Sequence, residues 1–152
     1  MKLVSIKLEE ITGLHPAVTG MVDKTASVIY ASGPADYQEL SLLYLLKLHP
    51  IHLTKIDTRF VVVAGFRSYE LARLLLHPET EVGCILHIKL KPEEPTLLAT
   101  VDIFGSPLMH SLGPKYIQQL QALAKFFGNR ASIFFPRMGS LRRLRGQNRT
   151  TD

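Results

Sequence analysis

The residues best suited to chemistry in this sequence form a short stretch, Gly65-Phe66-Arg67-Ser68, which follows an apolar run at 60–64. A glycine between a strand and a helix lets the backbone turn tightly, and the N–H groups of the following helix then point at one spot. The arginine adds a forked donor suited to phosphate oxygens, and the serine hydroxyl either caps the helix or bonds the ligand. The stretch predicts an anion site, although the four residues alone also fit an ordinary strand-to-helix turn with a surface arginine.

Glu70 and Arg73 lie one turn apart in the helix predicted beyond this stretch. Hydrolysis of a phosphodiester or phosphoanhydride needs charge neutralisation, usually by a divalent metal held by carboxylates, and a positioned water. We expect Glu70 to hold Mg²⁺ or the water and Arg73 to supply a second cation. The alternative is a solvent-facing pair worth about 0.3 kcal/mol to the helix. The sequence does not identify the metal ligands. Three further candidates are Asp57, Asp102 and His110, whose positions relative to the turn the sequence does not predict.

The elements that must position these residues belong to an α/β fold, a compact mixed sheet with packed helices. Hydrophobic periodicity predicts strands at 3–11, 51–56, 60–64 and 82–90, and a short one at 27–31. It predicts helices at 36–48, 68–76 and 113–128, the first of them apolar nearly all round and therefore buried. The segment 97–103 fits either a strand or a helix. Because the run 60–64 has no polar alternation, we expect a central strand covered on both faces.

The composition indicates a single domain of an intracellular kind. The chain has 152 residues, of which 46% are hydrophobic, and no apolar run approaches the roughly 20 residues of a membrane span. The N-terminus alternates polar with apolar residues and so lacks the apolar segment of a signal peptide. Cys84 is the only cysteine, which excludes an intramolecular disulfide, and we expect it to pack rather than to act as a nucleophile. We therefore expect a cytoplasmic protein with no membrane insertion.

The positive charge of the chain is concentrated at its C-terminus. Of the formal net charge of +5, the segment 137–152 contributes five arginines against a single acid; the arginines are Arg137, Arg142, Arg143, Arg145 and Arg149. Such a segment attracts nucleic acid through phosphate neutralisation without reading its sequence. We divide the chain into a domain at 1–136 and a basic, flexible tail at 137–152 that binds DNA. The alternative is a solvated end that only aids solubility.

The region 3–90 resembles the N-terminal domain of ParB proteins, within the ParB/sulfiredoxin superfamily. The resemblance rests on the order and spacing of Pro50-Ile51-His52-Leu53 and of the segment 60–74, in which a Val-rich strand leads into the glycine and arginine of the turn. It implies that Gly65 is the turn glycine of the family and that Arg67 contacts nucleotide phosphate. Phe66 departs from the pattern, because ParB proteins usually have Glu there and sulfiredoxin has its catalytic Cys. The departure argues against both CTP turnover and sulfinic-acid repair.

The resemblance ends before the helix-turn-helix and dimerisation segments of partition proteins. What remains is similar to a stand-alone branch that includes plasmid fertility-inhibition proteins of the Osa type, which have ATPase and DNase activity. It implies, as the first hypothesis, a Mg²⁺-dependent phosphohydrolase acting on ATP or another nucleotide and on DNA. The second hypothesis is a non-catalytic module that senses a nucleotide or binds DNA. The third is an inhibitor that acts by binding a protein partner.

Overall fold

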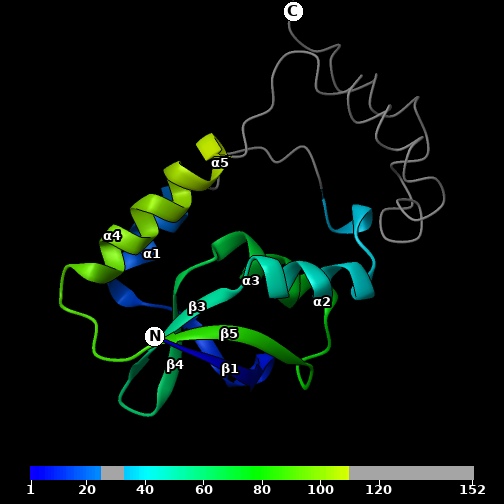
Figure 1. Cartoon of the computed structure of the whole chain (residues 1–152), viewed down its shortest axis with the longest axis horizontal. Helices are drawn as coiled ribbons and strands as arrows, with labels where there is room; N and C mark the ends of the chain where they lie inside the picture. Colours follow the sequence, from blue (N-terminus) through cyan, green and yellow to red (C-terminus); the bar gives the residue numbers. More distant parts are fainter. Residues whose placement is uncertain (25–32, 110–152) are drawn as a thin grey trace, which may run out of the picture.

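The computed structural model describes residues 1–24 and 33–109 of the chain. Within them the fold is α/β, a mixed sheet flanked by helices (Figure 1). The strands are β1 (Lys2–Lys7), β2 (Ile11–Leu14), β3 (Ile51–Ile56), β4 (Arg59–Ala64) and β5 (Glu81–His87). The α-helices are α1 (Pro16–Lys24), α2 (Glu39–Leu48), α3 (Phe66–Leu75), α4 (Glu94–Thr100) and α5 (Ser106–Met109). A π-helix, η4 (Val101–Gly105), joins α4 to α5, and short 3₁₀ turns lie at Leu8–Glu10 (η1) and Pro34–Asp36 (η3). The predicted α/β class is confirmed.

The sheet has five strands in the order β1-β5-β3-β4-β2. β1 pairs with β5 and β3 with β4 in antiparallel fashion, whereas β5 pairs with β3 and β2 with β4 in parallel. The register places His52 of β3 opposite Ala64, the last residue of β4. The end of β4, the start of β3 and the start of α3 therefore meet at the same end of the two central strands.

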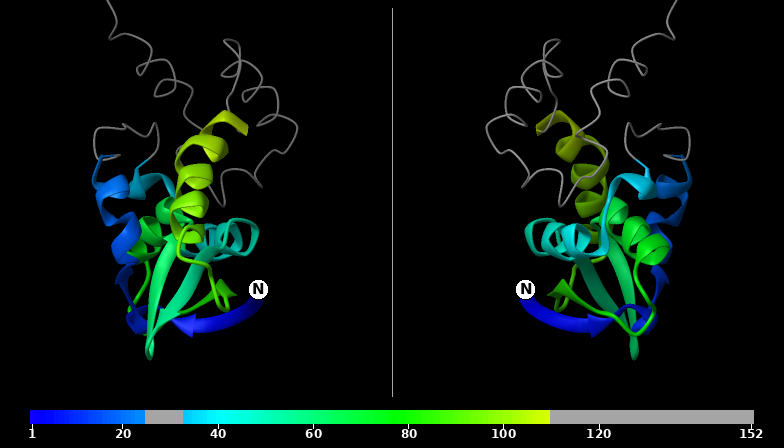
Figure 2. Two further views of the ribbon diagram at one scale, coloured as in Figure 1. Left: turned by 90° about the vertical axis from the view of Figure 1, so that its left-hand side faces the viewer. Right: turned by 90° about the vertical axis from the view of Figure 1, so that its right-hand side faces the viewer.

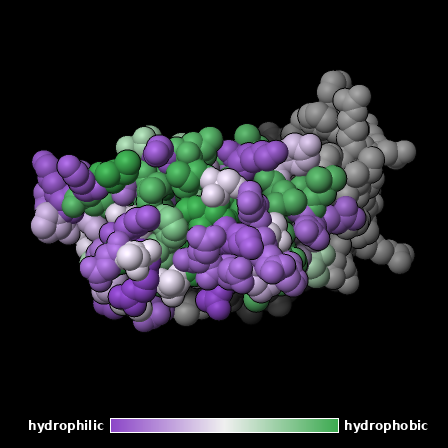
Figure 3. Space-filling model, turned by 90° about the horizontal axis from the view of Figure 1, so that it is seen from below, coloured by the Kyte–Doolittle hydropathy of each residue, from purple (hydrophilic) through white to green (hydrophobic). Residues whose placement is uncertain are grey.

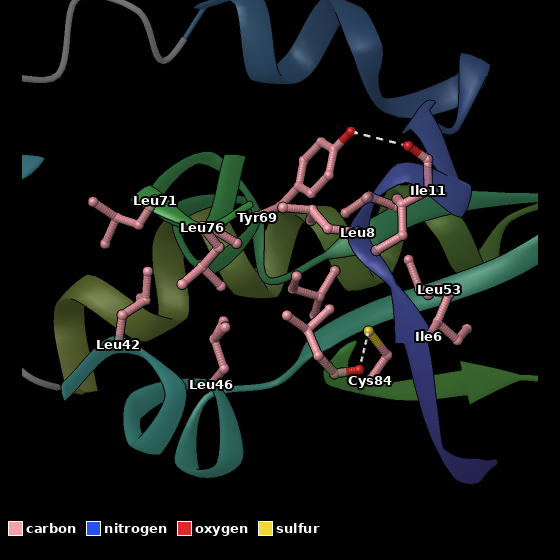
Figure 4. Packing of buried hydrophobic residues seen from close by; sticks show 14 residues of the cluster. Ile6, Leu8, Ile11, Leu42, Leu46, Leu53, Tyr69, Leu71, Leu76 and Cys84 are labelled. Carbon is pink, nitrogen blue, oxygen red and sulfur yellow. Dashed lines mark hydrogen bonds between the residues drawn. The ribbon is translucent and has the colours of Figure 1, made fainter. Parts of the chain in front are cut away.

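One face of the sheet packs against α2 and α3. Because side chains alternate along a strand, Leu53, Val62 and Cys84 point to the same face, where they join leucines of both helices in one buried cluster. Figure 4 shows Leu42 and Leu46 of α2 facing this cluster. The Tyr69 ring lies in it as well, and its hydroxyl donates to the Ile11 carbonyl at 3.5 Å (Figure 4). This packing fixes the direction in which α3 leaves β4.

The opposite face of β4 is covered by α4, which α1 flanks (Figure 2). Val61 and Val63 point to this side and are buried, as are Val18 of α1 and Ala99 of α4. The strand 60–64 is thus covered on both faces, as its lack of alternation predicts. In Figure 1, α4 and α5 lie along one rod. The segment η4 joins them, and a hydrogen bond from the Gly65 N–H to Asp102 brings it to the residue that follows β4.

The predicted boundaries hold for the central hairpin and change elsewhere. The strand predicted at 3–11 is interrupted at Leu8 by the 3₁₀ turn, and the helix α1 was not predicted. The helix predicted to begin at Asp36 begins at Glu39, where the Ser41 hydroxyl accepts a hydrogen bond from the Gln38 N–H at 3.0 Å. The segment 97–103 is helical, and β5 ends at His87 instead of 90. The predicted strand at 27–31 and helix at 113–128 lie outside the described residues.

Helix α2 is less buried than its composition predicts. Leu42 and Leu46 are buried, whereas Leu40, Tyr44 and Leu48 form an exposed apolar row at four-residue spacing. On the face shown in Figure 3, apolar side chains also reach the surface between hydrophilic ones. None of the helices within the described residues has the length and apolar character needed to cross a bilayer.

Candidate functional site

Gly65 makes the turn between β4 and α3 in a conformation that favours glycine. Its φ of +75° and ψ of +35° are left-handed, and a Cβ at this position would lie 2.6 Å from the Pro50 carbonyl oxygen. The Gly65 carbonyl accepts the first hydrogen bond of α3, from the Tyr69 N–H at 2.9 Å. Two backbone constraints therefore select glycine at the residue that the sequence singled out.

The N–H groups of this turn converge on a carboxylate. The Gly65 N–H and the Phe66 N–H both donate to Oδ2 of Asp102, at 2.8 and 3.1 Å. Asp102 lies on η4, 37 residues further along the chain, and its Oδ1 accepts a longer bond from the Ser106 hydroxyl at 3.5 Å. The first N–H groups of a helix have no partner within the helix, and the helix dipole favours negative charge there. The turn thus binds an anionic oxygen, and here the chain supplies it.

Arg67 and Glu70 form an ion pair on the first turns of α3. Arg67 Nη1 lies 2.6 Å from Glu70 Oε2, and the two side chains are 26% and 52% exposed. The sequence predicts that Glu70 holds a metal or a water and that Arg73 is a second cation, whereas in the structure Glu70 pairs with Arg67. The Arg73 guanidinium instead lies 5.7 Å from the centre of the Tyr69 ring.

The other two residues of the turn have structural partners. The Ser68 hydroxyl donates to the His49 carbonyl at 2.8 Å and so joins α3 to the end of α2, instead of capping α3. The Phe66 side chain packs against the buried cluster. The side chains of Ser68 and Phe66 therefore hold the turn in place. The groups left to bind an anion are the N–H groups of Gly65 and Phe66, and the guanidinium of Arg67 is close to them in sequence.

His52 and His87 form a side-chain pair on the neighbouring strands β3 and β5. Nδ1 of His52 lies 2.9 Å from Nε2 of His87, and the ring centres are 5.2 Å apart. The difference of 2.3 Å is about two imidazole ring radii, so both nitrogens lie near the line between the ring centres. This is an end-on N–H···N hydrogen bond in which one ring donates and the other accepts. The two nitrogens are aimed at each other and do not converge on a shared metal position.

Burial lowers the pKa of both histidines. For His52 desolvation is the larger cause, and the negative charge of Asp102 partly offsets it. For His87 desolvation is again the first cause, and His52 lowers its pKa further. Both rings are therefore neutral at pH 7, which suits a hydrogen bond that needs one acceptor nitrogen.

This pair makes stability depend on pH. Since the folded-state pKa values lie below the unfolded value of about 6.5, the unfolded chain binds more protons as the pH falls through 6.5. The free energy of unfolding should be flat near pH 8 and should decline toward pH 5.5, by up to about 1.4 kcal/mol per pH unit for each proton. Urea unfolding at steps of pH measures this. His52→Gln with His87→Gln should reduce the decline and leave the part that His15 contributes, because burial lowers the pKa of His15 as well. An unchanged slope in the double variant would contradict the assignment.

Metal ligands do not gather at this site. Within residues 1–24 and 33–109, no three side chains of His, Cys, Asp or Glu come together so as to hold a metal ion. Mg²⁺ stays a prediction of the sequence. Asp57 lies at the tip of the β3–β4 hairpin with a φ of 55°, at the other end of β4 from the turn. His110 and the five arginines of 137–152 lie outside the described residues.

No family model and no curated protein matches the chain. The resemblance to ParB and sulfiredoxin domains therefore stays a prediction of the sequence.

Asp102 and the histidine pair are the residues whose roles the sequence did not reveal. Asp102 is the only acid in the apolar run 97–104, and an isolated acid in a helix of this kind is a usable signal for a specific partner. The contact between His52 and His87 gave no such signal, because the two residues lie 35 apart in the sequence and only the pairing of β3 with β5 brings them together.

Proposed function

We propose that this chain is a nucleotide-binding domain whose phosphate site is the turn Gly65–Phe66 at the start of α3. The observation that carries the proposal is the convergence of two N–H groups on one oxygen of Asp102, at 2.8 and 3.1 Å. Carboxylate and phosphate oxygens accept the same charge-assisted hydrogen bonds, so a turn arranged for one suits the other. The resemblance of the strand-glycine-arginine core to ParB and sulfiredoxin domains makes ATP the first ligand to test.

Arg67 is the side chain expected to join the N–H groups in holding phosphate. Its bond to Glu70 links two partly exposed side chains, and such pairs contribute about 0 to 1 kcal/mol. A phosphate offers more negative charge and matches the two-pronged geometry of a guanidinium. Exchange of Glu70 for a phosphate oxygen is therefore favourable once a ligand occupies the turn.

ATP binding by purified protein tests this proposal. We expect Arg67→Ala to weaken ATP binding by about tenfold or more, because a hydrogen bond to a charged group is worth about 1.5–3 kcal/mol. Arg59→Ala is the matched control, since it removes the same charge from the exposed start of β4, at the other end of the strand from Gly65. Isothermal titration in Mg²⁺ buffer gives the dissociation constants. The proposal is wrong if the wild type does not bind ATP, or if both arginine variants bind as the wild type does.

A phosphohydrolase acting at the same site is the second candidate. The observation in its favour is that two carboxylates lie at the turn, with Asp102 on its N–H groups and Glu70 on Arg67. Either could orient a water or a metal near a bound phosphate. The same samples, given labelled ATP and plasmid DNA with Mg²⁺ or with EDTA, distinguish the two functions. Metal-dependent product that Glu70→Ala abolishes would establish the enzyme, and ATP binding without product would leave the binding module.

Two further parts of the sequence-based interpretation remain proposals. DNA contact through the arginines of 137–152 concerns residues outside those described. Inhibition by binding a protein partner has only the exposed apolar row of α2 to support it, at Leu40, Tyr44 and Leu48. The proposed phosphate site depends on neither of these two proposals.

A further inference from the structure

We propose that Asp102 is a built-in competitor that occupies the phosphate site of the free protein and that a phosphate ligand must displace. This inference rests on the function proposed above and concerns the regulation of the same site. Oδ2 of Asp102 accepts both N–H bonds that the turn offers, from Gly65 and from Phe66. One oxygen on two donors is the position that a phosphate oxygen would take, so the two anions exclude each other.

The competitor is attached to an element that can respond to its release. Asp102 is the second residue of η4, a π-helix between α4 and α5. π-helical turns are rare, are short and frequently occur at functional sites. The two N–H bonds reach from this turn to a segment 37 residues away in the sequence. Displacing Asp102 would free η4 from the start of α3.

Because Asp102 is part of the same chain, its attachment to the fold determines how strongly it competes with a ligand. A group held in place by the fold acts at a high effective concentration, so a ligand binds only to the fraction of molecules in which the carboxylate has left. The apparent affinity is lowered by that fraction. If the site is closed in more than about nine molecules in ten, removing the carboxylate should raise phosphate affinity about tenfold or more.

The first experiment measures the contact itself, without a ligand. Amide hydrogen exchange followed by NMR should show the Gly65 and Phe66 N–H groups protected in the wild type and faster to exchange in Asp102→Ala. Asp102→Asn keeps an acceptor oxygen without the charge and should lie between the two. Fast exchange of both N–H groups in the wild type would overturn the inference, because Asp102 would then not occupy the turn.

The second experiment measures competition, with inorganic pyrophosphate as the probe because it has phosphate but no base. Asp102→Ala should bind it about tenfold tighter than the wild type, and Asp102→Asn should show a smaller gain. Glu79→Ala removes one negative charge from an exposed site and should bind as the wild type does. In the wild type, pyrophosphate should also shift the amide resonances of residues 101–105, since η4 is released.

The outcomes separate this inference from the function on which it rests. Equal pyrophosphate affinity in the wild type and both Asp102 variants would overturn the competitor and leave the phosphate site in place. An equal gain in Glu79→Ala would also overturn it, because net charge alone would explain the effect. No binding by any variant, including Asp102→Ala, would overturn both proposals. Thermal unfolding of each variant shows that the fold is intact before the titrations are compared.

Discussion

Gly65→Ala is expected to lower the free energy of unfolding by about 3 kcal/mol or more. The left-handed φ of +75° costs an L-residue roughly 1–2 kcal/mol. The new Cβ would also lie 2.6 Å from the Pro50 carbonyl oxygen and 3.1 Å from Cα of Ile51, both backbone atoms that cannot rotate away. Urea unfolding, read by circular dichroism, measures the change.

Two other substitutions test the reason for this loss. Gly20→Ala is the matched control: it adds the same methyl group inside α1, where a Cβ meets nothing within 4 Å, and should stabilise the protein by about 0.5–1 kcal/mol. Gly65→Asn separates the two causes, because asparagine tolerates the left-handed region but keeps the Cβ. If the clash with Pro50 dominates, Asn will cost about as much as Ala. A loss below about 1 kcal/mol in Gly65→Ala would show that the turn is not as tight as described.

The strand and turn of the candidate site could be predicted because their signals are local. The run 60–64 lacks polar alternation and ends at a glycine, and both properties follow from neighbours in the sequence. The structure places β4 inside the sheet, buries Val61 to Ala64 and starts α3 directly after Gly65. The helix begins two residues earlier than its apolar spacing indicates, because Phe66 and Arg67 have helical conformation without contributing to that spacing.

Elements whose signals depend on packing could not be predicted. α1 begins at Pro16 and contains Gly20, so its sequence lacks a clear apolar period, yet Val18 is fully buried. The short apolar run at 97–103 fits two structures equally until its contact with β4 is known. α2 illustrates the converse, because an apolar sequence alone does not tell which leucines the core has room for.

The occupant of the turn is the clearest case of information that is absent locally. The sequence predicts that Gly65 and the residues after it can bind an anion, and the geometry agrees. A carboxylate from η4 occupies the turn because α4 packs on β4. The residues near Gly65 in the sequence carry no information about that packing. The pairing of Arg67 with Glu70, by contrast, follows from their spacing of three residues on α3. Both contacts show that groups expected to be open already have partners within the chain.

Cys84 gives the second prediction with a large expected effect, a thiol that is nearly unreactive while the protein is folded. Its side chain is fully buried in the cluster beneath α2 and α3, and its Sγ lies 3.6 Å from the Val82 carbonyl oxygen (Figure 4). Desolvation raises the pKa of the thiol from 9.0 to about 12. Because the thiolate is the reactive form, this rise alone reduces the reactive fraction at pH 8 by about a thousandfold, and burial blocks access as well.

Labelling with a thiol-specific disulfide reagent at pH 8 tests this expectation. The folded protein should react at least about a thousandfold more slowly than the protein in denaturing urea, where the pKa returns to its ordinary value. Thr58→Cys in a Cys84→Ala background places a thiol on the exposed hairpin tip and should react quickly in the folded state. Rapid labelling of folded wild type would contradict the packing role and reopen a nucleophilic one. A packing role also predicts that Cys84→Ser destabilises the domain more than Cys84→Ala, because a buried hydroxyl without a good partner costs about 1–3 kcal/mol.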